Sequence, residues 1–348
     1  MIRFNSDYLE GAHPEIMARL METNLEQTPG YGEDAHCERA RAIIRGLCRA
    51  PDADVHFLVG GTQTNFTFLS AVLKPWQGVI CADTGHIAVH ETGAVEATGH
   101  KVIALPGSDG RVDAADVDAY CALHYADESH EHMVMPGAVY VSNPTEVGTL
   151  YSRDQLSDLR EVCDRWGLTL YLDGARLGYG LASPENDLDL PFIAEVTDAF
   201  YIGGTKQGLL FGEALVITRE DLQPDFRYMI KQKGGMLAKG RLLGVQFEAA
   251  LEDGLYMDMA RHAIQLAMRL KSGLQALGVD LMIDSPTNQQ FPILPDDALD
   301  RLKRAYSYAT IQKIDADRTA VRFCTSWATR EEDVECLLAD LRDLIQED

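Results

Sequence analysis

Two side chains follow neighbouring apolar segments and could share one chemical task. Asp173 comes directly after 168-LTLYL-172, and Lys206 follows 199-AFYIG-203 within the glycine-rich turn GGTKQG. Consecutive parallel strands end at one edge of a sheet, where open α/β sheets bind ligands. A carboxylate there can keep a pyridine nitrogen protonated, because a nearby anion raises the pKa of its partner. An amine beside it can form a Schiff base, so the pair suits pyridoxal phosphate.

Each of these two residues has an ordinary explanation when it is taken alone. Asp-Gly pairs such as Asp173-Gly174 most often mark turns. A lysine between two apolar runs is most often a solvated loop cation, because lysine is rarely buried. Only the succession of the two strand ends favours a shared cofactor.

A third segment, 58-LVGGTQTNF-66, could bind the phosphate of such a cofactor. Glycines after a strand let the backbone approach an anion, and the helix expected from about Thr62 offers free N–H groups and the positive end of its dipole. The segment lacks both the GxGxxG pattern and the GxxxxGK[ST] loop. A nicotinamide enzyme or an NTPase is therefore less strongly indicated.

The elements that must position these residues alternate along the first two-thirds of the chain. Helical spacing of apolar residues predicts helices over 14–26, 33–49 and 64–73. Short apolar or β-branched runs predict strands over 55–59, 79–82, 101–106, 138–142, 168–172, 199–203 and 213–218. This alternation is typical of an α/β fold with a doubly wound, mostly parallel sheet.

From about residue 240 the pattern changes. Long amphipathic helices are predicted over 244–277 and 329–346, with strands over 279–284 and 319–327 between them. We therefore expect a small α+β domain packed on the large one. The predicted division is an N-terminal arm over 1–13, a large domain over 14–240 and a small domain over 241–348.

Composition excludes several classes of partner. The chain has 348 residues, and 31 Lys and Arg against 54 Asp and Glu give a net charge of −23 without a basic cluster. A nucleic-acid or anionic-membrane partner is therefore not expected. No signal peptide and no membrane-length apolar run is apparent, and the seven cysteines form no CxxC pair, so we expect a cytoplasmic protein with reduced thiols. His86 and His90 have the i,i+4 spacing of metal ligands, but no third ligand follows and no metal is predicted.

The sequence resembles the threonine aldolase and β-eliminating lyase family of fold-type I pyridoxal-phosphate enzymes over nearly its whole length. The matching segments, in order, are 4-FNSD-7, 30-GYGED-34, 60-GGTQTN-65, 85-GHIAVHETGA-94, 142-SNPTEVGT-149, 171-YLDGAR-176, 203-GGTKQG-208, 234-GGMLAKG-240 and 320-AVRFCTS-326. The resemblance implies an aspartate aminotransferase-like large domain and a small C-terminal domain. It also implies a homodimer or a dimer of dimers (a homotetramer) with active sites at the subunit interface.

The resemblance also assigns roles to individual residues. Lys206 takes the place of the Schiff-base lysine, Asp173 that of the partner of the pyridine nitrogen, and His86 that of the ring stacked on the cofactor. The positions matching the phosphate contacts are Gly61, Thr62 and Thr205. The positions matching the groups that hold the substrate α-carboxylate are Ser6, Arg176 and Arg322, and Arg176 also counts among the cofactor-binding residues. An arginine fork suits a carboxylate because its N–H groups meet both oxygens.

The chain departs from the family pattern at two places. Thr145 stands where many threonine aldolases have a histidine near the β-hydroxyl of the substrate, which leaves the preferred β-substituent open. The basic segment 231–240 matches a phosphate-contacting loop only loosely, so the choice among Lys231, Lys233 and Lys239 is also open.

The implied activity is retro-aldol cleavage of a β-hydroxy-α-amino acid, such as L-threonine, L-allo-threonine or phenylserine, to glycine and an aldehyde. We hypothesise that His86, directly or through a water, takes the hydroxyl proton. One alternative is β-elimination or dehydration of a β-substituted amino acid with the same cofactor. Another is a non-catalytic binding protein of this fold, against which the retention of Lys206, Asp173 and both arginines argues.

Overall fold

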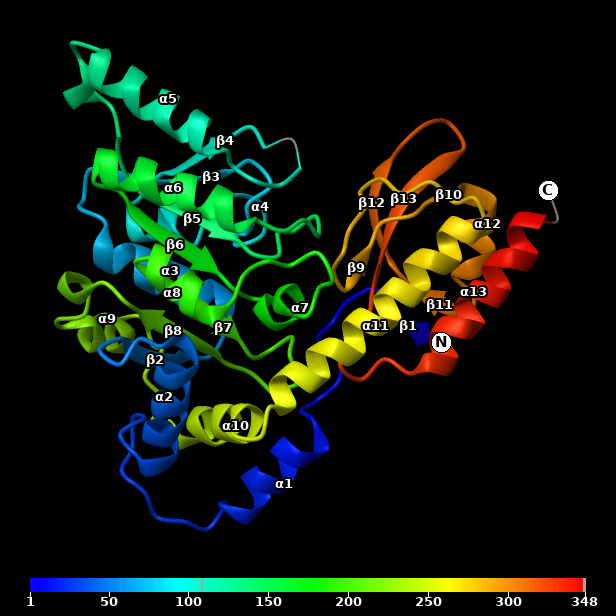
Figure 1. Ribbon diagram of the computed structural model, residues 1–348, viewed down its shortest axis with the longest axis horizontal. Coiled ribbons are helices and arrows are strands. Elements are labelled where there is room, and N and C mark those ends of the chain that lie inside the picture. The colour runs from blue at the N-terminus through cyan, green and yellow to red at the C-terminus, as the bar shows by residue number, and fades with distance from the viewer. Residues whose placement is uncertain (108, 347–348) are drawn as a thin grey trace.

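A central seven-stranded sheet dominates the computed structural model, which describes residues 1–107 and 109–346 (Figure 1). Its strand order is β2-β8-β7-β6-β5-β3-β4. The strands are β2 (Asp54–Leu58), β3 (Gln77–Ala82), β4 (Val102–Leu105), β5 (Met135–Ser142), β6 (Thr169–Asp173), β7 (Ala199–Gly203) and β8 (Glu213–Ile217). Every pairing is parallel except the two made by β8. The predicted α/β fold with a mostly parallel sheet is therefore confirmed.

Helices cover both faces of this sheet, as a doubly wound fold requires. They are α1 (Pro14–Glu22), α2 (Ala35–Cys48), α3 (Gly61–Val72), α4 (His86–Val89), α5 (Ala114–Ala126), α6 (Arg153–Trp166), α7 (Leu177–Leu181), α8 (Leu190–Val196), α9 (Phe226–Gln232) and α10 (Arg241–Leu251). Helices α3, α4 and α9 share a buried apolar cluster with one face of the sheet, and α2, α5, α6, α8 and α10 share another with the opposite face. Successive strand residues alternate between these two clusters, because side chains along a strand alternate between faces.

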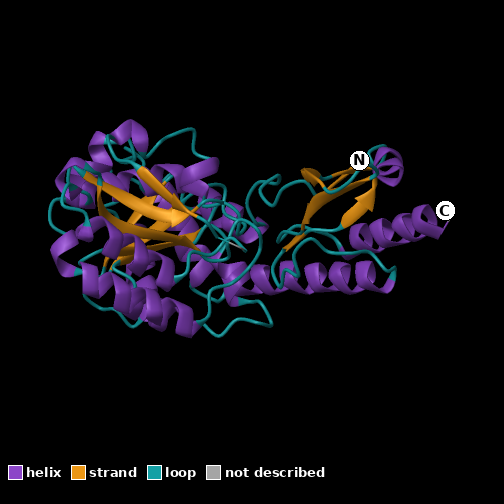
Figure 2. Cartoon of the chain, turned by 90° about the horizontal axis from the view of Figure 1, so that it is seen from above, coloured by secondary structure: helices purple, strands orange, loops and turns teal. Residues whose placement is uncertain are grey.

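A second, smaller body lies beside the first, and Figure 2 shows the long helix α11 (Leu255–Ala276) running from one to the other. Its remaining helices are α12 (Asp296–Leu302) and α13 (Glu331–Gln346). Its strands are β9 (Gln289–Gln290), β10 (Ile293–Pro295), β11 (Tyr306–Ser307), β12 (Ala309–Lys313) and β13 (Arg318–Cys324), joined by β1 (Ile2–Arg3) from the start of the chain. Strand β1 pairs with β11, and Phe4 lies in the apolar cluster of this body. The first residues are therefore part of a folded core.

Two predicted elements of the second half are wrong. The helix expected over 244–277 is divided into α10 and α11, because Gly254 has a φ of 80° and ends one helix before the next begins. The strand expected over 279–284 is reduced to a single bridge between Leu281 and Pro292.

The division of the chain at residue 240 stays a prediction. Helix α10 lies after that point, yet its buried Leu243 and Phe247 belong to the same apolar cluster as the large sheet. This packing favours a junction beyond α10, near the start of α11.

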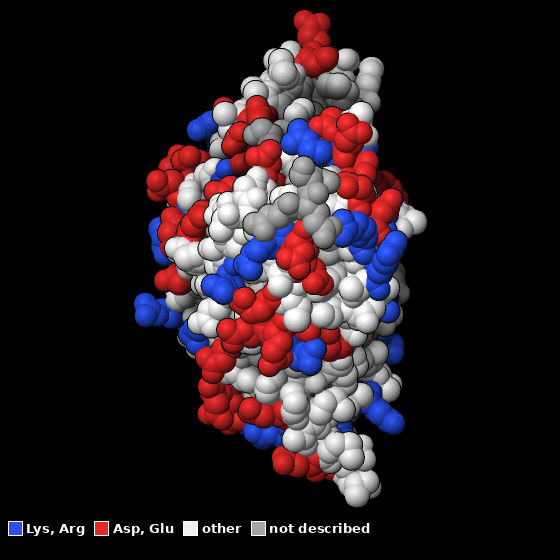
Figure 3. Space-filling model, turned by 90° about the vertical axis from the view of Figure 1, so that its right-hand side faces the viewer, with Lys and Arg blue, Asp and Glu red and all other residues white. Residues whose placement is uncertain are grey.

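Acidic and basic side chains are interspersed on the face shown in Figure 3, and acidic ones predominate there. This distribution agrees with the net charge of −23. Among the described residues, no helix is both long and apolar enough to cross a membrane.

The contact between α2 and α10 depends on a glycine and gives a test of the packing. A Cβ on Gly244 would lie 2.5 Å from the backbone nitrogen and the Sγ of Cys37. We expect Gly244→Ala to lower the free energy of unfolding by about 1–3 kcal/mol, because an overpacked contact must move apart. Thermal unfolding at fixed protein concentration measures this.

The matched control is Gly46→Ala in α2, where an added Cβ meets no atom of the described residues within 4 Å outside its own stretch of helix backbone. This change should raise stability by up to about 1 kcal/mol, because alanine is the better helix former. Equal effects of the two substitutions would contradict the close packing of α2 on α10.

Candidate active site

Asp173 is a buried carboxylate at the carboxyl end of β6. Its Oδ2 accepts hydrogen bonds from Tyr140 Oη at 2.6 Å and from Asn65 Nδ2 at 2.9 Å. Its Oδ1 accepts from Tyr201 Oη and from the Ala175 N–H at 3.0 Å. Burial raises the pKa of Asp173, but the charge of His86 and these hydrogen bonds outweigh it and lower the pKa below its usual range. The group is therefore held as an anion.

Three tyrosines form the surroundings of Asp173. Tyr140, Tyr171 and Tyr201 each stand two residues before the end of their strand, in the adjacent strands β5, β6 and β7. Because strand side chains alternate, all three point to the face covered by α3, as Asp173 does. Tyr171 Oη donates to Asn65 Oδ1 at 3.0 Å, which orients the amide toward Asp173. A tyrosine two residues before the end of three successive strands is the sequence signal for these surroundings.

Lys206 follows β7 in the turn between β7 and β8, as the sequence predicted. Tyr179 Oη donates to the Lys206 carbonyl at 2.6 Å, which fixes the backbone of this turn. Burial and the charge of Arg176 lower the pKa of the Lys206 amine, although Asp7 and Asp173 act in the opposite direction. A lowered pKa increases the share of the neutral, nucleophilic amine.

Arg176 forms a two-point ion pair with Asp7, a residue that sequence reasoning missed. The Arg176 Nε and Nη2 donate to the Asp7 oxygens at 2.6 and 3.0 Å. Asn288 Nδ2 from the second body donates to the same carboxylate at 2.9 Å. Burial raises the pKa of Asp7, but the charges of Arg176 and Lys206 and the hydrogen bonds overcome it and lower the pKa to about 2. The pair therefore joins the N-terminal segment, the large sheet and the second body.

The segment from Gly60 to Thr62 lies at the start of α3 and lines the same cavity as Lys206. The first N–H groups of a helix have no partner within it, so they can bind an anion. A Cβ on Gly61 would lie 2.9 Å from Tyr201 Oη, so glycine is needed for the helix to start this close to the strand.

Thr205 lines the cavity, but its hydroxyl already has partners. Thr205 Oγ1 donates to Glu213 Oε1 at 2.9 Å and accepts from the Gly212 N–H at 3.1 Å. Burial raises the pKa of Glu213 to about 8, against the hydrogen bonds from Thr205 and the Gly204 N–H and the charge of Lys206, which lower it. A raised pKa favours the neutral carboxyl group, which would repel a bound phosphate less than a carboxylate does.

His86 begins α4 and is oriented by a carboxylate. Its Nδ1 lies 2.7 Å from Glu91 Oε1, an oxygen that also accepts from Asn65 Nδ2 at 2.7 Å. Burial lowers the pKa of His86, but the hydrogen bond that its Nδ1–H donates to Glu91 and the charges of Asp173 and Glu91 outweigh it and raise the pKa. The hydrogen bond to Glu91 leaves Nε2 as the ring nitrogen available to a ligand.

One cavity of about 280 Å³ brings together seven of the nine predicted site residues, namely Gly61, Thr62, His86, Asp173, Arg176, Thr205 and Lys206. The described residues that line it do not include Ser6 or Arg322. Arg322 Nη1 donates to Gln289 Oε1 at 3.0 Å and Nη2 to the Asn5 carbonyl at 3.4 Å. Both Ser6 Oγ and Arg322 Nε are buried and lack a hydrogen-bond partner in the part of the chain that the structure describes.

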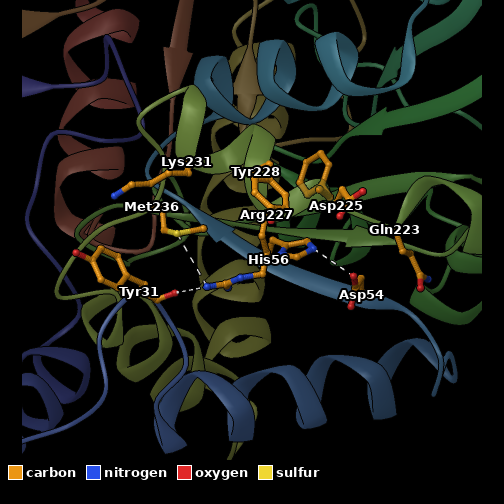
Figure 4. Close-up of a pocket in the computed structure, with 10 residues that line it drawn as sticks. Tyr31, Asp54, His56, Gln223, Asp225, Arg227, Tyr228, Lys231 and Met236 are labelled. Carbon is orange, nitrogen blue, oxygen red and sulfur yellow. Dashed lines mark hydrogen bonds and ion pairs between the residues drawn. The ribbon is translucent and has the colours of Figure 1, made fainter.

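The segment 231–240 lies partly at a second cavity of about 780 Å³ (Figure 4). There the Lys231 ammonium lies 4.8 Å from the centre of the Tyr31 ring. The segment also reaches the start of α3, because Gln63 Nε2 donates to the Lys233 carbonyl at 3.3 Å. This second cavity is larger but contains neither Lys206 nor Asp173, so we place the chemistry in the smaller one.

Thr145, which replaces the histidine of many relatives, is buried and tied to its own loop. Its Oγ1 lies 2.7 Å from Thr149 Oγ1 and accepts from the Thr149 N–H at 3.1 Å. The next residue, Glu146, lines the cavity and was not predicted.

Three comparisons relate this chain to known proteins. The sequence profile described as "Beta-eliminating lyase" matches residues 3–296. The chain is 33% identical over 349 residues to a "Low specificity L-threonine aldolase" of Pseudomonas aeruginosa, covering 98% of this chain and 97% of that one. A protein of the same description from a Pseudomonas strain is 32% identical over 345 residues, with the same coverage. A solved structure of Leishmania major threonine aldolase has 45% identity and a TM-score of 0.96, covering 99% of this chain and 100% of that one.

The ion pair of Asp7 with Arg176 gives a stability prediction. We expect Asp7→Asn to lower the free energy of unfolding by about 3–5 kcal/mol at neutral pH, because Arg176 would keep a buried, uncompensated charge. Since folding lowers the pKa of Asp7 from 3.8 to about 2, the wild-type advantage should be full above pH 3.8 and fade as the pH falls toward 2. Chemical unfolding at several pH values measures this.

Asp258→Asn is the control, because Asp258 pairs with Arg261 on the surface. An exposed pair contributes little, so this variant should resemble the wild type at every pH. An Asp7→Asn variant as stable as this control would contradict the role given to the buried pair.

Proposed function

Because the chain belongs to the β-eliminating lyase family, we propose that its smaller cavity holds pyridoxal phosphate and cleaves β-hydroxy-α-amino acids to glycine and an aldehyde. The substrates in question are L-threonine, L-allo-threonine and related compounds. The observation that carries this proposal is the joint presence of the Lys206 amine and the anionic Asp173 in one cavity. The threonine aldolase descriptions of the relatives support the choice of substrate.

The residues present fit the cofactor. Asp173 offers a carboxylate to the ring nitrogen, Lys206 an amine to the aldehyde, and the start of α3 at Gly61 and Thr62 an anion site for the phosphate. His86 offers an imidazole for stacking on the ring. When bound, pyridoxal phosphate supplies an aldehyde that reacts with amines and a ring that accepts electrons.

Hydrogen bonds, burial and nearby charges set the protonation states of Asp173 and Lys206 in the cavity. The two tyrosine hydroxyls and Asn65 keep Asp173 ionised, so it favours a protonated ring nitrogen beside it. The lowered pKa of Lys206 leaves more of its amine neutral and able to attack a carbonyl.

We place the α-carboxylate of the substrate at Arg176, with Arg322 and Ser6 as further partners. Asp7 occupies the Nε and Nη2 of Arg176 and so holds the guanidinium in one orientation. Ser6 and Arg322 do not line the cavity, but their Oγ and Nε are buried donors without a partner among the described residues, which supports assigning them to a ligand. Fixing the carboxylate in this way would orient the Cα–Cβ bond and so select which bond breaks.

Elimination at Cβ is the second candidate activity, and Thr145 is the observation that favours it. The Thr145 hydroxyl is engaged with Thr149, so it does not replace a histidine near the β-hydroxyl. A non-catalytic role is disfavoured, since Lys206 and Asp173 are both present in the cavity.

We also propose a cytoplasmic homodimer or dimer of dimers whose active sites lie at the subunit interface. Six of the seven cysteines are buried free thiols, which supports a reducing compartment. The exposed Tyr31 and Tyr228 at the second cavity offer apolar surface of the kind that subunits bury.

Lys206→Ala tests the cofactor assignment. Purified wild-type protein should be yellow, and borohydride should attach the cofactor covalently at Lys206, as peptide mass spectrometry would show. The variant should take no label and lose turnover, whereas Lys101→Ala, an exposed lysine elsewhere, should behave as wild type. Colourless wild-type protein that stays unlabelled with added cofactor would refute the assignment.

Product analysis separates the two candidate activities. With L-threonine or L-allo-threonine we expect equal amounts of glycine and acetaldehyde, because aldol cleavage breaks the Cα–Cβ bond. A keto acid with ammonia would instead show elimination. Chromatography of the amino acids together with an aldehyde assay measures both outcomes.

A further inference from the structure

Glu146 lines the cavity of the proposed active site and has one carboxylate oxygen without a hydrogen-bond partner among the described residues. Its Oε1 accepts a hydrogen bond from Ser142 Oγ at 2.6 Å and one from the His86 N–H at 3.1 Å. Its Oε2 is buried and finds no hydrogen-bond partner within residues 1–107 and 109–346. Unpaired buried carboxylate oxygens are costly, so such an oxygen calls for a functional explanation.

The loop that carries Glu146 is fixed on both sides. Thr145 bonds Thr149 across it, and Ser285 Oγ from the second body donates to the Gly148 carbonyl at 2.9 Å. These contacts hold the backbone on both sides of Glu146.

His86 is less suited to accept a proton than the sequence suggested. Its Nδ1 is engaged by Glu91, and its raised pKa favours the protonated ring near neutrality. Burial raises the pKa of Glu146, and this effect outweighs the hydrogen bond from Ser142 that lowers it. A carboxylate whose pKa is shifted upward is a stronger base than an ordinary one.

We propose that Glu146 is the catalytic base that removes the β-hydroxyl proton of the substrate. The inference rests on the proposed aldol cleavage. Glu146 Oε2 takes the proton, and the O–H electron pair becomes the second bond of the aldehyde carbonyl. The Cα–Cβ electron pair stays with the glycine fragment, which regains one proton at Cα, so that no co-reactant is needed.

Several titratable groups act on Glu146 and must be included in any pH analysis. They are His86 on α4, Asp173 on β6, Arg176 before α7, Tyr140 on β5, Cys81 on β3 and Tyr151. We expect kcat/KM for threonine to fall at acidic pH, because a protonated Glu146 cannot accept the β-hydroxyl proton. This fall is the acidic limb of the pH profile.

Glu146→Gln is the central test, because glutamine keeps an oxygen for Ser142 and His86 but cannot take up a proton. We expect cleavage of threonine to fall by about 10²–10⁴-fold, as is usual for the loss of a general base. Cofactor affinity, measured by absorbance titration of the cofactor-free protein, should stay close to wild type. Exchange of the glycine α-proton for deuterium, followed by NMR, should also persist, because this reaction involves no β-hydroxyl.

Ser142→Ala is the companion variant. It removes the donor that stabilises the Glu146 carboxylate, so it should move the acidic limb to higher pH while cleavage persists. A purely structural role of Glu146 would leave the limb in place.

The cofactor-free protein provides a readout that does not involve turnover. Folding raises the pKa of the Glu146 carboxyl group. The folded protein therefore loses stability relative to the unfolded chain as the pH rises from the unfolded pKa to the folded pKa. Glu146→Gln should therefore raise Tm at pH 8, and this gain should disappear near pH 4. A lower Tm of the variant at pH 8 would identify a structural anchor and overturn the proposal.

The remaining outcomes are distinguishable. Wild-type protein that neither binds the cofactor nor exchanges the glycine proton would refute the proposed function itself. Wild-type protein that does both, with Glu146→Gln cleaving threonine at the wild-type rate, would overturn this inference alone. Loss of turnover in His86→Phe but not in Glu146→Gln would return the base to His86.

Discussion

The burial of one negative charge organises this molecule. Asp173 lies at the end of a central strand, where an unpaired carboxylate would be expensive. Tyr140 and Tyr201 from the flanking strands and Asn65 from α3 donate to it. Through Asn65 the same network reaches Glu91 and so orients His86. The position of α3, and with it the anion site at its start, is thus fixed by the requirement that Asp173 remain charged.

A second buried pair connects the two bodies of the chain. Asp7 belongs to the segment that follows β1, Arg176 to the loop after β6, and Asn288 to the segment before β9. Because these three side chains meet, the second body cannot move independently of the cavity without breaking a charged interaction. The predicted carboxylate site at Arg176 therefore lies beside a charged contact that joins the two bodies.

The sequence predicted the α/β class, all seven strands of the large sheet, and the positions of Asp173 and Lys206. These features depend on apolar periodicity and on the succession of strands along the chain, which are visible in the sequence. It failed at Gly254, where one left-handed residue divides a continuous amphipathic pattern. It also missed Asp7, Glu91 and Glu146, whose importance comes from contacts across the fold that no spacing reveals. The tyrosines of β5, β6 and β7 are an intermediate example. Their shared position in each strand is visible in the sequence, but their role follows only from their place around Asp173.

The carboxyl groups around the cavity differ in charge because their partners differ. Asp173 and Asp7 have lowered pKa values because hydrogen bonds and nearby cations outweigh burial. For Glu146 and Glu213 burial outweighs the donors, so their pKa values are raised. The ring end of the proposed cofactor site is thereby anionic, whereas at the end beside Thr205 the raised pKa of Glu213 favours a neutral carboxyl group. Such a difference favours a protonated ring nitrogen beside Asp173 and lowers the repulsion on a phosphate beside Thr205, and the raised pKa of Glu146 suits a group that exchanges a proton.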